Sequence, residues 1–546
     1  MSFEIRDRDL LGRIGRLKTR SGIVETPALL PVVNPMEQTI PPKKMKERFR
    51  CQIIITNAYI IKRRFEEEAI KLGIHDLLEY EGVVVTDSGG YQVLVYGDVN
   101  ASPEEMIEFQ EAIGSDVAII LDHPTGWGVP RERAEWTVEV TLRRAEEAVE
   151  RILGSSTLWI GPVQGGEYLD LVEHSARRLG MLPFQLYALG SPTQVMERYL
   201  FPLLVDMIMT AKRNLPVDRA FHLFGAGHPF MFALAVALGC DLFDSAAYAL
   251  YARNGRYLLP YGTRRLEELS YLPCSCPVCR SRDVEDLKET PALMRTSLLA
   301  EHNLYVSMAE IDRVKQAMRE GTLWELLEVR CRSHPALASA LMHLSRYRED
   351  LEKGAPSFKG RGLFYYDSAS LSRPEITRHR KRLFENYQPP SKVDTLLLLP
   401  APTRKPSDTA PECKKFQTEA ESVLGDCYQR IHLCFYAAPF GVVPLELSET
   451  YPLSQYEASR PLGADTIDYV VTQVEAYISR GRYRLVVLQD ASEDYGNRLR
   501  SACERSCKET GASILISSDG APWSSETISR LMEMLKEALS SPPNRG

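Results

Sequence analysis

The chain has 546 residues, of which 44% are hydrophobic and 25% charged, and its 66 basic and 73 acidic residues give a formal net charge of −7. These proportions are typical of a folded protein and exclude a disordered chain, a collagen-like repeat and a small disulfide scaffold. At roughly 100–200 residues per domain, the length predicts two to four domains. The net charge alone does not favour a nucleic-acid partner, because such proteins usually carry a basic domain.

The N-terminal twenty residues are charged and have no apolar centre, so we expect no secretory signal. No stretch approaches the ~18–20 consecutive apolar residues of a membrane helix, so we expect no membrane partner. Three of the 11 cysteines fall within six positions and the others are scattered. This distribution predicts reduced thiols with a metal cluster, in a cytoplasmic protein.

Short β-rich runs alternate with helical segments over the first two-thirds of the chain. Each run ends in Gly, Pro, Asp or Gln, and a helical segment such as 131–153, opened by Pro130, usually follows. Apolar strands that alternate with helices indicate parallel β/α units. Six such units before residue 260, without a G-x-G-x-x-G motif, favour a (β/α)8 TIM barrel over an open doubly wound sheet. The predicted strands are 83–86, 117–121, 158–163, 185–189, 220–224 and 240–243.

The remaining sequence predicts a second, smaller α/β domain. Residues 300–365 have helical apolar spacing, and 371–392 is a charged passage with three prolines that resembles a boundary. We therefore expect a barrel domain over 1–365, a basic linker over 366–392 and a C-terminal domain over 393–546. In the C-terminal domain we expect strands at 393–399, 431–436, 485–488 and 513–517 and helices around 466–479, 497–510 and 525–540.

A cluster of potential metal ligands lies near the end of the barrel sequence. Cys274, Cys276 and Cys279 form a tight knuckle, and His302 follows 23 positions later. Three thiolates and one imidazole are the four ligands that tetrahedral Zn²⁺ prefers, and four protein ligands leave no open position. We expect one structural zinc ion per chain in a subdomain of about 270–305, although His302 could also be an ordinary helix histidine.

Three aspartates directly follow predicted strands: Asp87, Asp122 and Asp244. Barrel enzymes place their active sites at this end of the strands. Two nearby carboxylates can divide the roles of nucleophile and general acid/base, and a third can accept hydrogen bonds from a substrate N–H. Aspartate is also a favoured helix N-cap, so each residue alone leaves both interpretations open.

The sequence around these aspartates resembles a known family. The motifs are Thr86-Asp87-Ser88-Gly89-Gly90-Tyr91-Gln92, Leu121-Asp122-His123-Pro124-Thr125, Val163-Gln164-Gly165-Gly166 and the run from Phe243-Asp244-Ser245 to Ala252. Together with the zinc knuckle, they resemble the tRNA-guanine transglycosylases over roughly residues 3–350. Segments 31–35, 222–229 and 333–335 are similar to the archaeal, archaeosine-forming branch of that family.

This resemblance implies that guanine at position 15 in the tRNA D loop is exchanged for 7-cyano-7-deazaguanine through a covalent Asp–ribose intermediate. By the same resemblance Asp244 is the nucleophile and Asp87 the general acid/base, and the reverse division of roles stays open. Asp122 would read the N1–H and 2-amino edge of the base, and Gln164 its carbonyl. His123 and His228 are interpreted as structural. The implied substrate-binding residues are Ser88, Tyr91, Asp122, Gln164, Gly190, Ser191, Thr193 and Phe224.

The C-terminal region departs from the full-length family pattern. Residues 445–457 resemble a segment that archaeal transglycosylases share with archaeosine synthases, but no basic module of the PUA type follows. A separate PUA-domain protein and a homodimer are therefore possible partners, besides tRNA. Lys405 lies in a run similar to a synthase motif and is interpreted as a solvated loop lysine. Two alternatives stay open: an archaeosine synthase-like enzyme that acts on the inserted nitrile, and a non-catalytic tRNA-binding subunit.

Local basic clusters offset the negative net charge. Segment 43–50 holds five basic residues, and 371–392 holds six against two acidic ones, a local charge of +4. Basic clusters of this kind can contact the phosphates of tRNA, and ordinary solvated helix faces are the alternative. The candidate tRNA contacts in the second segment are Arg378, Arg380, Lys381 and Arg382.

Overall fold

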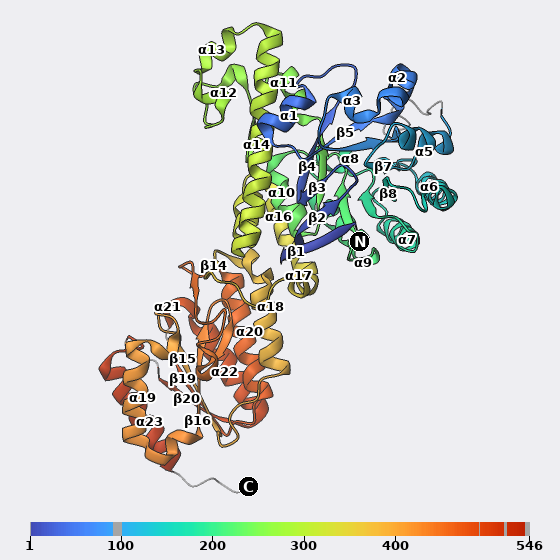
Figure 1. Cartoon of the computed structure of the whole chain (residues 1–546). Helices are drawn as coiled ribbons and strands as arrows, with labels where there is room; N and C mark the ends of the chain where they lie inside the picture. Colours follow the sequence, from blue (N-terminus) through green and yellow to red (C-terminus); the bar gives the residue numbers. More distant parts are fainter. Residues whose placement is uncertain (1, 91–100, 491, 518–520, 541–546) are drawn as a thin grey trace. The chain divides into compact units, whose positions relative to one another are not determined.

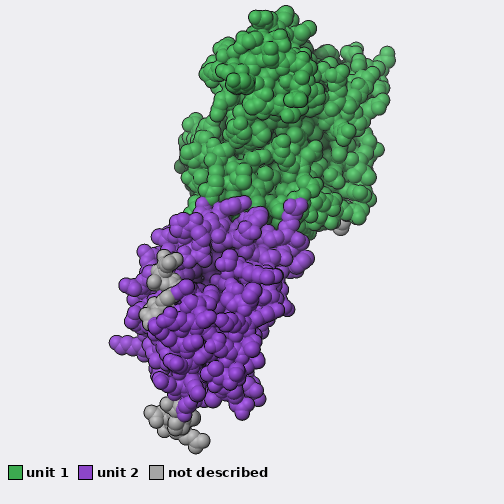
Figure 2. Space-filling view, turned by 90° about the vertical axis from the view of Figure 1, so that its left-hand side faces the viewer, with its two compact units in different colours: residues 1–346 green, residues 347–546 purple. Residues whose placement is uncertain are grey.

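The structure is a computed structural model of the chain and describes residues 2–90, 101–490, 492–517 and 521–540. The chain forms two compact units, Met1–Arg346 and Tyr347–Gly546, which Figure 2 distinguishes by colour. Within the described residues, no helix is both long and apolar enough to cross a membrane.

The first unit is built on a closed barrel of eight parallel strands, which confirms the predicted TIM barrel (Figure 1). The strands follow one another around the barrel in chain order, and the last strand pairs with the first. The six predicted strands are β6 to β11, and β4 and β5 complete the barrel. The bounds are β4 (Ala28–Val33), β5 (Ile53–Asn57), β6 (Val83–Asp87), β7 (Val117–Ile119), β8 (Leu158–Val163), β9 (Leu186–Leu189), β10 (Ala220–Leu223) and β11 (Leu242–Ser245).

Helices on the outside of the barrel connect these strands, as parallel β/α units require. Helix α6 begins directly after Pro130, which occupies the N-cap position with non-helical backbone angles (φ −56°, ψ 150°). The helices are α1 (Pro42–Phe49), α2 (Ala58–Leu72), α3 (Ile74–Leu78), α5 (Pro103–Ala112), α6 (Arg131–Ile152), α7 (Leu169–Gly180), α8 (Thr193–Glu197), α9 (Phe201–Asn214), α10 (Phe232–Ala237) and α11 (Ala247–Arg253).

The N-terminal end of the barrel is covered by an antiparallel sheet of β1 (Phe3–Asp9), β2 (Gly12–Lys18) and β3 (Ile23–Thr26). Phe3, Leu17 and Val24 from this sheet belong to the same buried cluster as the inward side chains of the barrel strands. The apolar interior of the barrel therefore continues into this sheet at the N-terminal end of the strands.

Inward-facing positions follow the period of two that a strand imposes. On β5, Ile53 and Ile55 are part of the interior cluster, and Asn57 is the next residue of the same parity. The same parity leads from Val85 to Asp87 on β6, and from Leu242 to Asp244 on β11. Polar side chains thus form the last layer of the barrel interior.

After the barrel, a small hairpin and several helices complete the first unit. The hairpin pairs β12 (Arg256–Leu259) with β13 (Gly262–Arg265). The long helix α14 is in contact with α11, α12 and β12, so it connects the cysteine knuckle to the barrel. The helices of this region are α12 (Pro277–Arg280), α13 (Val284–Glu289), α14 (Ala292–Glu320), α15 (Leu323–Cys331) and α16 (Pro335–His343).

The second unit is a three-layer α/β/α fold, which confirms the predicted C-terminal α/β region. Its five-stranded sheet has the order β17-β16-β15-β19-β20, in which only β17 is antiparallel to its neighbour. The strands are β15 (Thr395–Pro400), β16 (Ile431–Ala437), β17 (Gly441–Pro444), β19 (Leu485–Gln489) and β20 (Ser513–Ser517), and a separate pair joins β14 (Leu363–Tyr365) to β18 (Tyr456–Ala458).

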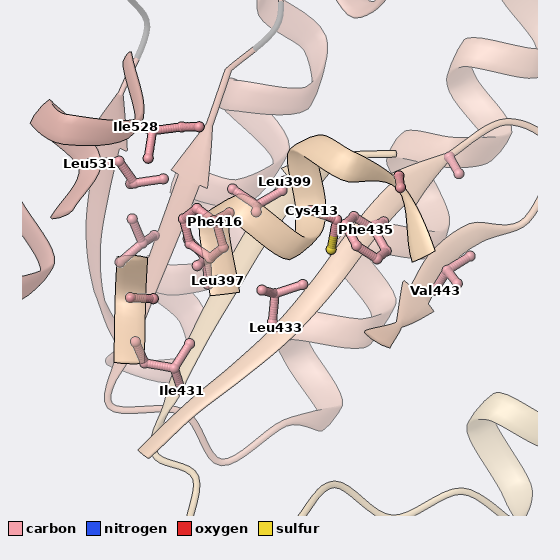
Figure 3. Close-up of a cluster of buried hydrophobic side chains, with 14 of the residues drawn as sticks. Leu397, Leu399, Cys413, Phe416, Ile431, Leu433, Phe435, Val443, Ile528 and Leu531 are labelled. Atoms are coloured by element: carbon pink, nitrogen blue, oxygen red, sulfur yellow. The ribbon is translucent and has the colours of Figure 1, made fainter. Parts of the chain in front are cut away.

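Both faces of this sheet are buried, so its strands are continuous apolar runs. Leu397 and Leu399 point to one face, where Phe416 and Leu531 cover them (Figure 3). Leu396 and Leu398 point to the other face. The helices are α19 (Pro411–Leu424) and α23 (Ser525–Ser540) on the first face, α20 (Ala464–Arg480) and α22 (Asn497–Thr510) on the second, with α17 (Arg348–Gly354), α18 (Pro374–Glu385) and α21 (Ser492–Tyr495).

The limits of the two compact units differ from the predicted domain limits. The units divide between Arg346 and Tyr347, whereas the barrel domain was expected to reach residue 365. The expected linker 366–392 contains α18, whose Ile376 and Leu383 belong to the two cores of the second unit. This segment is therefore a folded part of the second unit.

Candidate active site and metal centre

Asp87 and Asn57 form a polar pair at the end of neighbouring strands. The Asn57 side chain donates to the Asp87 carboxylate (Nδ2–Oδ2 3.0 Å), and the two residues are register partners in the β5–β6 ladder. Burial raises the pKa of Asp87 to about 7, and the negative charges of Asp122 and Asp244 contribute to this rise. Asp87 can therefore give and accept a proton near neutral pH.

Asp122 is buried in the loop after β7 and is held by Gln164. The Gln164 amide donates to the Asp122 carboxylate (Nε2–Oδ2 2.6 Å), while its own oxygen accepts from the backbone N–H of Thr125 (3.1 Å) and the hydroxyl of Ser191 (3.0 Å). Burial raises the pKa of Asp122 to about 6, and the Gln164 hydrogen bond opposes the rise. The two side chains are thus fixed side by side, with a hydrogen-bond acceptor on Asp122 and a donor on Gln164. They form one polar edge.

The backbone around Gly190 lies directly against this edge. A Cβ atom at Gly190 would overlap the Gln164 amide, so this position requires glycine. Ser191 has a left-handed backbone (φ 61°), which is strained for a residue with a side chain, and its hydroxyl also accepts from the N–H of Gly126 (3.2 Å). Gln164 is therefore in contact with three other predicted residues, Asp122, Gly190 and Ser191.

Asp244 faces the barrel interior from β11 and is held through one oxygen. Its Oδ1 accepts from His222 Nε2 and from the backbone N–H of Gly225, both at 2.9 Å. Gly225 has a φ of 67°, and a Cβ there would lie 2.6 Å from the hydroxyl of Thr193. Phe224 lies against the interior cluster, with its ring 4.8 Å from that of His222. Thr193 and Phe224 are thus adjacent to Gly225 and His222, the two groups that hold Asp244.

Ser88 and Tyr91 complete the predicted pocket residues. Ser88 is buried, and its hydroxyl donates to the carbonyl of Ile120 (3.0 Å), which joins the loops after β6 and β7. Tyr91, the predicted stacking residue, lies outside the described residues.

Two polar residues of the site, Asn57 and His222, were not among the predicted site residues. Both stand one strand period beyond an apolar inward position, Ile55 on β5 and Ala220 on β10. A polar residue that continues the inward parity of a barrel strand was the signal in the sequence for both. The two histidines interpreted as structural lie in different environments. Burial lowers the pKa of His228 to about 3. His123 contacts Trp136, which is half-exposed (4.6 Å between ring centroids).

The cysteine knuckle and His302 form a compact group that could hold a metal ion. The four ligand atoms lie within 4.8 Å of one another. The His302 Nε2 atom lies 2.9 Å from the carbonyl of Leu258, so Nε2 carries the hydrogen and Nδ1 faces the thiols of Cys276 (3.5 Å) and Cys279 (3.4 Å). Such a backbone contact is how proteins fix the tautomer of a metal-binding histidine. Tyr257 stacks on the imidazole (3.6 Å between ring centroids).

The four basic residues predicted to contact tRNA lie on α18 in the second unit, and their environments differ. Arg378 donates to the Glu352 carboxylate (2.7 Å) and to three backbone carbonyls. Lys381 also pairs with Glu352 (3.7 Å), and Arg380 is half-buried. Arg382 is exposed and lines a cavity of about 320 Å³. Arg382 is therefore the most accessible of the four.

Lys405 is not solvated as the sequence suggested. Its side chain is half-buried, its ammonium donates to the carbonyl of Pro402 (2.6 Å) and lies 4.9 Å from the ring centre of Tyr456. Burial and the nearby charge of Arg460 lower the pKa of Lys405 to about 8.

Comparison with known proteins identifies the family. The family described as queuine tRNA-ribosyltransferase matches residues 8–336, more than half of the chain. The chain belongs to this family. It is therefore a pentosyltransferase that acts on tRNA. A domain of unknown function, DUF5591, matches residues 376–535 in the second unit.

Archaeal relatives resemble the chain over both units. A tRNA-guanine(15) transglycosylase of Aeropyrum pernix is 45% identical over 88% of this chain and 93% of its own length. Proteins with the same name from Haloferax volcanii and Methanosphaera stadtmanae are 44% and 43% identical over 83% and 84% of the chain. These alignments cover 83% and 68% of the two relatives.

Proposed function

We propose that the chain exchanges guanine 15 in the D loop of tRNA for 7-cyano-7-deazaguanine, with Asp244 as nucleophile and Asp87 as general acid/base. The observation that carries this proposal is the convergence of Asp87, Asp122 and Asp244 at one barrel end, where their charges interact. The archaeal relatives named tRNA-guanine(15) transglycosylase support the choice of base.

The proposed reaction has two half-reactions with opposite proton transfers. The Asp244 carboxylate attacks C1′ of the ribose, the C1′–N9 bond breaks, and Asp87 gives its proton to the departing guanine. In the second half, Asp87 takes a proton from the incoming base, whose nitrogen attacks C1′ and releases the Asp244 carboxylate. One residue must serve as acid and then as base, which a pKa of about 7 for Asp87 favours.

Recognition of the base is proposed for the edge formed by Asp122 and Gln164. An ionised Asp122 would accept hydrogen bonds from N1–H and the 2-amino group, and Gln164 would donate to the carbonyl with its second N–H. The target nucleotide must leave its stack to reach this depth, so an aromatic platform is needed. Phe224, and Tyr91 outside the described residues, are proposed for it.

We further propose that the cysteine and histidine group binds one structural zinc ion. Three thiolates and one imidazole in mutual reach fit tetrahedral Zn²⁺. The ion would attach the knuckle to helix α14, which carries His302. Four protein ligands leave no position for a substrate or a reactive water, so the proposed role is structural.

An exchange assay tests the proposed function directly. Wild-type protein is incubated with archaeal tRNA and labelled guanine, and separately with 7-cyano-7-deazaguanine followed by mass spectrometry of the nucleosides. We expect incorporation in both, and none in Asp244→Asn, which keeps the shape of the side chain. Full exchange by that variant would overturn the assignment of the nucleophile, while tRNA binding without exchange by the wild type would favour a non-catalytic subunit.

The environment of Lys405 keeps a second candidate, in which its amine attacks the nitrile of the inserted base. A lysine with a pKa of about 8 is partly unprotonated near neutral pH and therefore nucleophilic. This function predicts an adduct between the protein and tRNA that already carries the cyano base, and loss of the adduct in Lys405→Met. Absence of the adduct in wild type would exclude it.

Partners and tRNA contacts remain separate proposals. Exposed Arg382, with Arg380, Lys381 and Arg378, is proposed to contact tRNA phosphates, so Arg382→Ala should flatten the salt dependence of tRNA binding. Two protein partners are also proposed for the chain in the cytoplasm, a separate PUA-domain protein and a second copy of the chain in a homodimer. A pull-down tests the first, and light scattering tests the second.

A further inference from the structure

We propose that His222 is a positioning residue for the exchange reaction, because it holds the Asp244 carboxylate in the orientation required for attack. This inference rests on the proposed function, in which Asp244 is the nucleophile. His222 lies on the adjacent strand β10 and contacts Asp244 through Nε2.

The hydrogen bonds of Asp244 are unequally divided between its two oxygens. Oδ1 accepts from His222 Nε2 and from the Gly225 N–H, both at 2.9 Å. No described residue donates to Oδ2, and the side chain keeps 16% of its surface exposed. A carboxylate fixed through one oxygen can rotate little, so Oδ2 is the atom available to attack C1′ of the ribose.

The burial of His222 indicates that its role is directed at Asp244. The ring is fully buried, and Nδ1 has no hydrogen-bond partner among the described residues. Burying a polar ring with one unpaired nitrogen costs free energy that an apolar residue would not cost. The neighbouring inward positions are apolar, as at Ala220 and Leu242. An apolar residue such as leucine could fill this position, but it could not donate a hydrogen bond to Asp244. We therefore assign the role of His222 to its contact with Asp244.

The same two donors would act in both half-reactions. When Oδ2 bonds to C1′, Oδ1 becomes the carbonyl oxygen of the ester and still accepts from His222 and Gly225. When the incoming base attacks C1′, the C1′–Oδ2 bond breaks and its electron pair returns to the carboxylate. Donors already placed at Oδ1 stabilise that returning charge without reorganisation. Removal of the His222 donor should therefore lower kcat rather than weaken tRNA binding.

The test compares two amide variants that differ by one methylene. The terminal nitrogen of glutamine can reach the place of His222 Nε2, whereas that of asparagine ends near the place of Nδ1. We expect His222→Asn to lower kcat and the rate of covalent tRNA adduct formation by roughly 10- to 100-fold, the range of a hydrogen bond to a charged group. KM for tRNA should stay within about 3-fold, and His222→Gln should recover most of kcat.

A matched control lies at the opposite end of the same barrel. His75 Nε2 is 3.2 Å from the buried carboxylate of Asp116, which precedes β7. His75→Asn removes this contact with an aspartate, and His75→Gln retains it. Both variants should keep the wild-type kcat in the folded fraction. If His222→Asn does not fold, His222→Leu replaces it with the same expected loss of kcat.

The outcomes separate this inference from the proposed function. A wild-type protein without exchange refutes the proposed function. With an active wild type, an unchanged kcat in His222→Asn refutes the positioning role. The positioning role is also refuted if the asparagine and glutamine variants lose kcat equally and in proportion to their loss of folded protein. Selective loss in the asparagine variant with recovery in the glutamine variant supports it.

Discussion

Replacement of Asp87 by asparagine should raise the stability of the protein relative to the wild type, and this gain should increase with pH. Burial raises the pKa of Asp87 from 3.8 to about 7, with a contribution from the negative charges of Asp122 and Asp244. The difference, 7 − 3.8, is about 3 units, or about 4 kcal/mol at 1.36 kcal/mol per unit. This value is an upper bound, because Asp87 keeps part of its surface exposed at the barrel mouth, where solvent screens its charge.

The sign follows from proton linkage. The folded state binds the Asp87 proton more tightly than the unfolded state, so the contribution of this group to stability is complete below about pH 4 and is lost as the pH rises through about 7. Asparagine does not ionise and escapes this loss. Between about pH 5 and pH 8, the stability of Asp87→Asn relative to wild type should rise by about 2–3 kcal/mol.

Chemical denaturation of both proteins at several pH values, followed by circular dichroism, measures this difference. Asp116→Asn is a control of opposite sign. Burial raises the pKa of Asp116, but hydrogen bonds from His75 and Ser21 outweigh it and hold that pKa below its usual value. Asp116→Asn should therefore lose stability at neutral pH. A difference between Asp87→Asn and wild type that does not change from pH 5 to pH 8 would refute the electrostatic reasoning for Asp87.

Three further predictions concern the metal centre, the base edge and the closed end of the barrel. Elemental analysis should find about one zinc per chain, and Cys276→Ser should lose the metal and melt at a lower temperature. Gly190→Ala introduces a Cβ that overlaps the Gln164 amide, so steady-state kinetics should show a roughly 10- to 100-fold lower kcat/KM for the base, about 1.4–2.8 kcal/mol, with unchanged tRNA binding. Arg13→Ala breaks the buried ion pair with Asp241 and should cost about 3–5 kcal/mol in chemical denaturation.

Each of these substitutions has a matched control in the chain. Cys331 is buried outside the metal group, and Cys331→Ser should retain the zinc. A Cβ atom at Gly360 would meet no described atom within 4 Å, so Gly360→Ala should leave kcat/KM unchanged. Arg6 forms an exposed ion pair with Glu4, and Arg6→Ala should cost no more than about 1 kcal/mol. Equal effects in a variant and its control would contradict the corresponding prediction.

The barrel could be predicted because parallel strands buried on both sides leave continuous apolar runs between polar loops. Asp87 and Asp244 could be proposed as candidate site residues because they stand at strand ends inside recognisable motifs. His222 and Asn57 could not be identified from such motifs alone. Their roles depend on which strands are neighbours, and the register that pairs Asn57 with Asp87 is a tertiary property.

The C-terminal segment shows a different limit of sequence-based prediction. The prolines and charges of 371–392 are typical of a linker, yet Pro374 occupies the first turn of α18, a position that proline favours. The apolar residues Ile376 and Leu383 then enter the cores on the two sides of the sheet. Lys405 was likewise interpreted as solvated because its contact with Tyr456 joins residues about fifty positions apart.

The environments of the two acids favour one division of labour over its reverse. In the proposed reaction, the residue that donates to guanine later accepts a proton from the incoming base, so its pKa should lie near the working pH. Asp87 meets this requirement, with a pKa of about 7 that burial and the neighbouring carboxylates produce. The nucleophile instead needs one oxygen fixed and the other accessible, as His222 and Gly225 leave Asp244. With the roles reversed, the attacking carboxylate would be largely protonated below neutral pH, and exchange would fall steeply there.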